Sequence, residues 1–98
     1  MENKYAVTLS LLVPVGLHTY GSFFLGTDRR EAKNIFGMLK GKTEPIQGCC
    51  IQMELCEEIS GITISIAVLH CCSENLKDNI AVISREVFRI SQLERGHG

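Results

Sequence analysis

The stretch "GCCIQMELCEEISGITISIAVLHCC", residues 48–72, predicts a β-hairpin that begins and ends at a pair of adjacent cysteines. It is rich in aliphatic and β-branched residues, and Ser60-Gly61 near its centre suits a two-residue hairpin turn. That turn places Ile59 opposite Ile62. A shift by one residue would place apolar side chains opposite glutamates, so the register is well specified.

Four cysteines meet at the open end of this hairpin, where the register places Cys49 opposite Cys72 and Cys50 opposite Cys71. Because neighbouring strand residues point to opposite faces, we expect Cys49, Cys72 and His70 on the apolar, helix-facing side and the other two cysteines outside. Adjacent cysteines lack the C-x₂-C spacing of common structural zinc sites, and five cysteines is an odd number for a disulfide framework. We therefore expect reduced thiols that serve as packing residues.

Two other interpretations of the cysteines stay open. A zinc site would use Cys49, Cys72 and His70, or all four sulfurs. A reactive thiol is the second, because Cys71 and Cys72 directly precede a predicted helix, whose positive N-terminal end lowers a thiol pKa. Cys50, opposite Cys71, would also be within reach of a transient disulfide.

The first half of the chain follows the same plan. Residues 4–13 alternate as a strand, and "PVG" after them predicts a three-residue loop that leads into a second strand. A helix follows, with Asp28 as its N-cap and Gly41 as its C-terminal stop. The apolar spacing after Ser73 predicts a second, longer helix, which Ser73 would cap.

Strand, strand and helix therefore occur twice in the same order (ββαββα). We expect a single α+β domain of two layers, in which a four-stranded, mainly antiparallel sheet packs one face against both helices. Its parts are the units 4–41 and 49–93, the linker 42–48 and a polar tail, 94–98. The order of the strands between the two hairpins is not specified by the sequence.

Composition and motifs exclude several function classes. A formal net charge of −1 disfavours binding to nucleic acid or to an anionic membrane surface. No apolar run approaches the ~20 residues of a membrane-spanning helix, and Pro14 interrupts the one segment that resembles a signal peptide. No G-x-S-x-G, H-E-x-x-H or catalytic-cysteine motif is present. We expect a cytoplasmic, non-enzymatic protein without a cofactor, zinc being the alternative.

The outer face of the predicted sheet carries more apolar residues than a solvated face requires. Aromatic side chains mixed with polar ones are typical of interfaces. We therefore predict a homodimer, or a complex with another protein, through this face, and a small-molecule groove beside Tyr20 and Phe24 as the runner-up. The predicted interface residues are Leu12, His18, Tyr20, Phe24 and Leu69.

Overall fold

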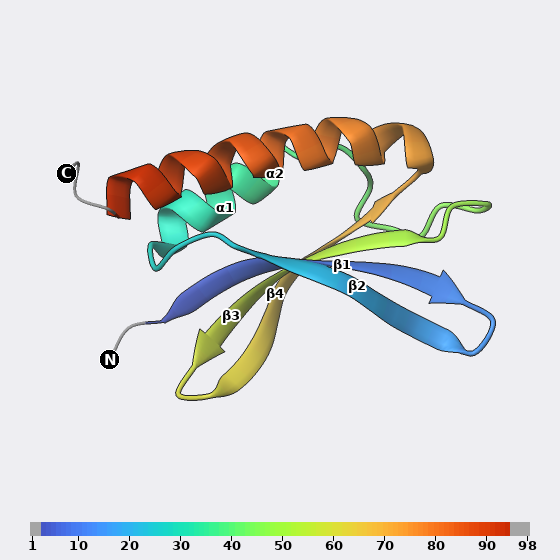
Figure 1. Ribbon diagram of the computed structural model, residues 1–98. Helices are drawn as coiled ribbons and strands as arrows, with labels where there is room; N and C mark the ends of the chain where they lie inside the picture. Colours follow the sequence, from blue (N-terminus) through green and yellow to red (C-terminus); the bar gives the residue numbers. More distant parts are fainter. Residues whose placement is uncertain (1–2, 95–98) are drawn as a thin grey trace.

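The protein is described by a computed structural model that covers residues 3–94, so residues 95–98 of the predicted polar tail lie outside the described part. Two helices pack on one face of a four-stranded antiparallel sheet (Figure 1), which confirms the predicted α+β architecture. The elements are β1 (Lys4–Val13), β2 (Gly16–Phe24), α1 (Arg29–Gly37), β3 (Ile51–Ile59), β4 (Ile62–Cys71) and α2 (Ser73–Glu94).

The strand order is β2-β1-β3-β4, so the first strands of the two hairpins form the centre of the sheet. β1 and β3 pair without interruption from Lys4–Glu58 to Leu11–Ile51. Each outer strand, in contrast, contains one β-bulge, which inserts an extra residue and reverses the faces of the residues beyond it.

In the first hairpin the turn has two residues, because Val13 pairs directly with Gly16. The expected three-residue loop was therefore wrong. Tyr20 is the extra residue of the bulge, and beyond it Leu9 pairs with Gly21 as predicted. His18 consequently lies opposite Leu11, on the helix side of the sheet and not on the outer face.

In the second hairpin the predicted register holds only near the turn, from Ile59–Ile62 to Cys56–Ser65. Ile66 is the extra residue there, and every later pair is displaced by one. Because of this displacement, the faces predicted for three residues were wrong. Leu69 and Cys71 turn to the helix side, and His70 turns to the outer face. The new pairs are Met53–Leu69, Gln52–His70 and Ile51–Cys71.

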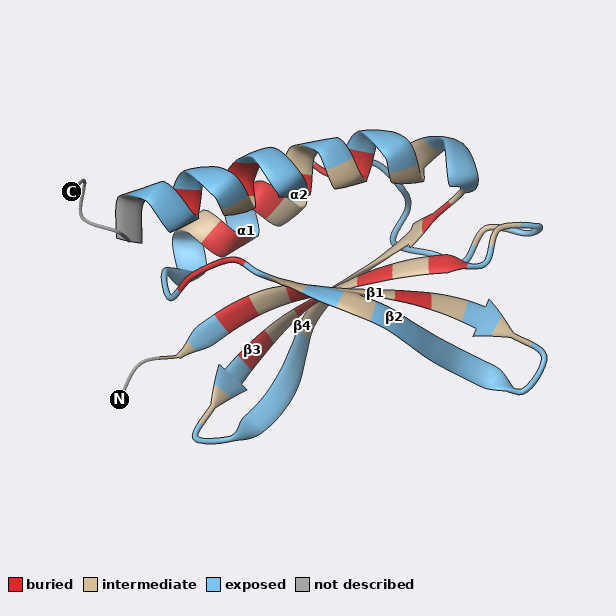
Figure 2. Cartoon of the chain, viewed as in Figure 1, coloured by how far each residue is buried: buried red, intermediate tan, exposed pale blue. Residues whose placement is uncertain are grey.

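The core lies between the helix-facing side of the sheet and the two helices (Figure 2). The apolar stripe predicted for α2 is confirmed, since Ile83 and Ile90 are buried and Leu76, Ile80 and Val87 pack beside them. The other buried apolar residues come from three regions: Tyr5, Val7, Ile51, Met53, Leu55 and Cys71 from the sheet, Ala32 and Ile35 from α1, and Leu25 and Leu39 from its flanks. Within residues 3–94, neither helix combines the length and the apolar character required to cross a bilayer.

The start of α1 is confirmed and its end is not. The Asp28 side chain accepts hydrogen bonds from the backbone N–H groups of Arg30 (2.9 Å) and Glu31 (3.2 Å), as an N-cap does. The helix ends at Gly37, before the predicted stop at Gly41.

Gly41 instead allows the chain to approach β4 closely. Lys42 and His70 exchange two backbone hydrogen bonds, of 2.9 and 2.7 Å, along the edge of β4. A Cβ atom on Gly41, whose φ is 150°, would lie 2.6 Å from the carbonyl oxygen of His70. A side chain at this position would therefore separate the bridge from the sheet.

Asn79 fixes the same segment from the other side. This residue of α2 is fully buried, and its side-chain amide pairs with the backbone of Lys40. Its Oδ1 accepts a hydrogen bond from the Lys40 N–H (2.7 Å), and its Nδ2 donates one to the Lys40 carbonyl (2.8 Å). The segment after α1 is thus held between α2 and the edge of β4.

We expect Gly41→Ala to lower the free energy of unfolding by about 2 kcal/mol, because the added methyl group both strains the backbone and contacts a carbonyl oxygen. Urea denaturation followed by circular dichroism measures the change. Gly37→Ala is the matched control, since nothing lies within 4 Å of the added Cβ there. Its stability should be unchanged or raised by up to about 1 kcal/mol. Equal stability of the two variants would contradict this account of Gly41.

Candidate functional site

The outer face of the sheet is the face opposite the two helices (Figure 1). Several large apolar side chains on this face are exposed to solvent. Leu12 is 60% exposed, Leu17 50% and Phe24 43%. Leu12 and Leu17 are direct partners across β1 and β2, and Phe24 lies opposite Ala6 at the other end of the same pair of strands. The apolar residues therefore form two groups, one at each end of the outer face.

Three predicted interface residues lie elsewhere. Leu69 packs against the core, because the bulge at Ile66 turns it to the helix side. His18 also faces the helix side, beyond the part that the helices cover. Its ring contacts the ring of Tyr20, with centroids 4.9 Å apart, so Tyr20 lies beside His18 and not on the outer face. Leu17, which was not among the predicted interface residues, lies on the outer face because β2 begins one residue earlier than expected.

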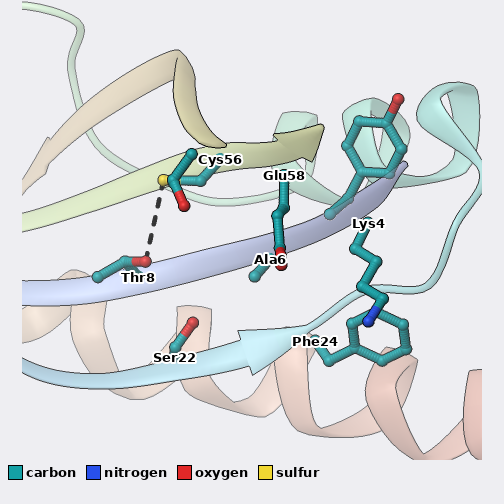
Figure 3. A pocket seen from close by; sticks show the side chains of 9 residues that line it. Lys4, Ala6, Thr8, Ser22, Phe24, Cys56 and Glu58 are labelled. Atoms are coloured by element: carbon teal, nitrogen blue, oxygen red, sulfur yellow. Dashed lines mark hydrogen bonds between the residues drawn. The ribbon is translucent and has the colours of Figure 1, made fainter. Parts of the chain in front are cut away.

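A groove of about 250 Å³ crosses the outer face next to Phe24 (Figure 3). Tyr20 does not line it, so the structure has the predicted groove beside Phe24 only. Lys4 and Glu58, which are direct partners in the β1–β3 ladder, border the groove with opposite charges. The complete lining is Lys4, Tyr5, Ala6, Thr8, Ser22, Phe24, Cys56, Glu58 and Thr63.

Cys56 supplies the one thiol of this groove. Its Sγ lies 3.9 Å from the hydroxyl of Thr8, and burial raises the pKa of the thiol (Figure 3). A raised pKa leaves less of the nucleophilic thiolate at neutral pH. The groove therefore suits binding through apolar contacts, hydroxyl groups and charges better than it suits thiol chemistry.

The cysteines at the open end of the second hairpin differ from the prediction of reduced thiols. Cys49 and Cys72 form a disulfide, with Cα atoms 4.9 Å apart. Cys50 is an exposed free thiol, whereas Cys71 is buried on the helix side. Burial raises the pKa of the Cys71 thiol, whose Sγ donates to the Lys40 carbonyl at 3.3 Å. The transient Cys50–Cys71 disulfide is thereby contradicted, because the two side chains lie on different faces.

The residues proposed as zinc ligands are not brought together in this arrangement. Cys49 and Cys72 are bonded to each other, His70 has turned to the outer face, and Cys71 is in the core. In the part of the chain that the structure describes, no group of three or more His, Cys, Asp or Glu side chains is arranged to hold a metal ion. The sulfurs of this region therefore offer disulfide chemistry instead of metal ligation.

The burial of the charged residue Glu57 in the sheet was not predicted. Glu57 lies on the apolar side of β3, and its carboxylate accepts hydrogen bonds from the Tyr5 hydroxyl (2.6 Å) and the Asn3 side chain (2.8 Å). Arg29, the first residue of α1, pairs with it at 3.3 Å. The bond from Tyr5 is the main cause that lowers the pKa of Glu57, and it raises the pKa of Tyr5. The sequence did contain a signal for this burial, because the alternation of buried positions 51, 53 and 55 continues to position 57.

We expect Glu57→Gln to be less stable than the native chain at neutral pH, because the amide loses the charge-assisted bonds to Tyr5 and Arg29. The lowered folded-state pKa means that the carboxylate stabilises the fold above its unfolded pKa of about 4.3, and that this contribution disappears as the pH falls through the folded value. Urea denaturation between pH 7 and pH 3 should show the two chains converging. A stability difference between the two chains that stays constant with pH would contradict this role of the Glu57 carboxylate. Glu44→Gln, in the exposed linker, is the control.

Comparisons with known proteins identify no relative: no family model, no curated protein and no solved structure matches the chain.

Proposed function

We propose that this chain is a small, non-enzymatic, cytoplasmic interaction module that forms a homodimer through the outer face of its sheet. The observation that carries the proposal is the exposure of Phe24 beside a groove on the outer face of the sheet (Figure 3). Aromatic side chains next to a pocket are the residues that most often dominate binding energy at protein interfaces. A half-exposed phenylalanine gains roughly 1 kcal/mol when a partner removes the rest of its surface from water.

A second copy of the chain fits the charges around this groove. Lys4 and Glu58 border it with opposite signs, and neither has an ion-pair partner among residues 3–92. A two-fold axis brings a patch against its own copy, so a patch that carries both signs can pair each charge with its opposite. Glu54, on the same face of β3, adds a second acceptor for the partner's Lys4.

The free edge of β2 supports the same partner. Its residues, "GLHTYGSFF", contain no charge and no proline, two of the means that prevent edge-to-edge pairing. A third, a β-bulge, is present at Tyr20, but the pairing from Gly21 to Phe24 is regular. The opposite edge is partly covered by the Lys42–His70 bridge. An interface that includes β2 would bury Phe24 and shield this edge at the same time.

We expect the native chain to be a dimer and Phe24→Glu to be a monomer, because the substitution places a negative charge in the centre of the interface. Native mass spectrometry and light scattering at matched concentrations measure the change. Phe88→Glu is the control: Phe88 is 67% exposed on α2, away from the outer face, and its substitution should leave the mass unchanged. A monomeric native chain, or a Phe24→Glu variant that remains dimeric, would refute the proposal.

A further inference from the structure

The open end of the second hairpin brings three chemically active groups to one small pocket. Cys49, which is bonded to Cys72, the exposed free cysteine Cys50, and His70 all line a cavity of about 100 Å³. Leu12 and Pro45 contribute apolar walls. Cys49 lines the cavity and Cys72 does not, so we take Cys49 as the cysteine that a molecule in the cavity approaches.

Cys72 is placed to leave as a thiolate. It is the N-cap of the 22-residue helix α2, because its carbonyl accepts hydrogen bonds from the N–H groups of Asn75 (2.9 Å) and Leu76 (3.2 Å). The backbone N–H of Cys72 in turn donates a hydrogen bond to Oδ1 of Asn75 (3.0 Å), which fixes the start of the helix. The positive end of a helix stabilises a thiolate, and a more stable leaving thiolate speeds attack on a disulfide.

His70 is held firmly beside the pocket. Both its backbone N–H and its carbonyl are bonded to Lys42, and its pairing with Gln52 directs the side chain to the outer face. An imidazole at this position can accept the proton of an incoming thiol, which must be lost before the sulfur becomes nucleophilic.

We propose that Cys49–Cys72 is an exchangeable disulfide that oxidises small thiols of the cysteine type. The incoming thiol transfers its proton to His70, and its sulfur attacks Sγ of Cys49. The Cys49–Cys72 bond breaks, Cys72 leaves as the thiolate, and a mixed disulfide with Cys49 forms. A second thiol then releases the first from Cys49, so two thiols become one disulfide and the protein retains two reduced cysteines. The 100 Å³ cavity suits the –CH₂–SH end of such a molecule, between Leu12 and Pro45.

The test measures how fast reduced glutathione opens the disulfide. The reaction is stopped with acid, free thiols are alkylated, and the intact mass reports how many cysteines have reacted. Before reduction, Cys50, Cys56 and Cys71 are the free cysteines. We expect the folded chain to react faster than the same chain unfolded in urea at the same pH, because only the fold places Cys72 at a helix N-terminus.

Two matched variants separate exchange chemistry from simple exposure. His70→Gln should slow the reaction of the folded chain about 100-fold, the lower end of the range for a general base, whereas His18→Gln on β2 should not change it. Cys50→Ser should react at the native rate, because Cys50 takes no part in the steps above. A folded chain that reacts no faster than the unfolded one would overturn the proposal, since the disulfide would then only brace the hairpin. Equal rates for His70→Gln and the native chain would overturn the role of His70.

Discussion

The uninterrupted pairing of β1 with β3 is the constraint on which the rest of the structure depends. Because this ladder contains no bulge, Tyr5, Val7, Met53 and Leu55 all face the helices, and together they form the floor of the core. A slip by one residue would turn this whole set to solvent. The outer strands are free to contain bulges because the central pair already fixes which face is buried.

The polar contacts of the core hold a helix that would not be stable alone. α1 has nine residues, fewer than the ~12–15 that an isolated helix needs to be even marginally stable in water. Arg29 at its start pairs with the buried Glu57, and Asn79 binds the backbone of Lys40 after its end. A third link joins the two helices, where Arg89 of α2 pairs with Glu31 of α1 and with Glu86. Burial of Ala32 and Ile35 then stabilises a helix whose position is fixed at both ends.

The sequence was sufficient to predict the layers but not the faces of every strand residue. Alternation in "KYAVTLSLLV" and "IQMELCEEI" is strict enough to identify the buried side of the central strands. The run "IAVLHCC" is apolar at nearly every position, so it fits either register, and nothing in it marks Ile66 as a bulge. Leu69, His70 and Cys71 were consequently assigned to the wrong faces. Gly41 was misread for a similar reason, because a glycine after a helix suits both a C-terminal stop and a close approach to a distant strand.

The two candidate sites lie at opposite ends of β3. The groove beside Phe24 includes Cys56 and Glu58 near the end of the strand, whereas the disulfide is attached just before its start. Leu12 lies at the disulfide end: it lines the small pocket, and its N–H donates a hydrogen bond to the Cys50 carbonyl at 2.8 Å. An interface confined to the Phe24 end would leave the disulfide accessible, so association and thiol exchange would be independent. An interface that extends along β2 to Leu17 would also bury Leu12, and would close the pocket through which a thiol reaches Cys49. The length of β2 that a partner covers therefore decides whether the two activities exclude each other.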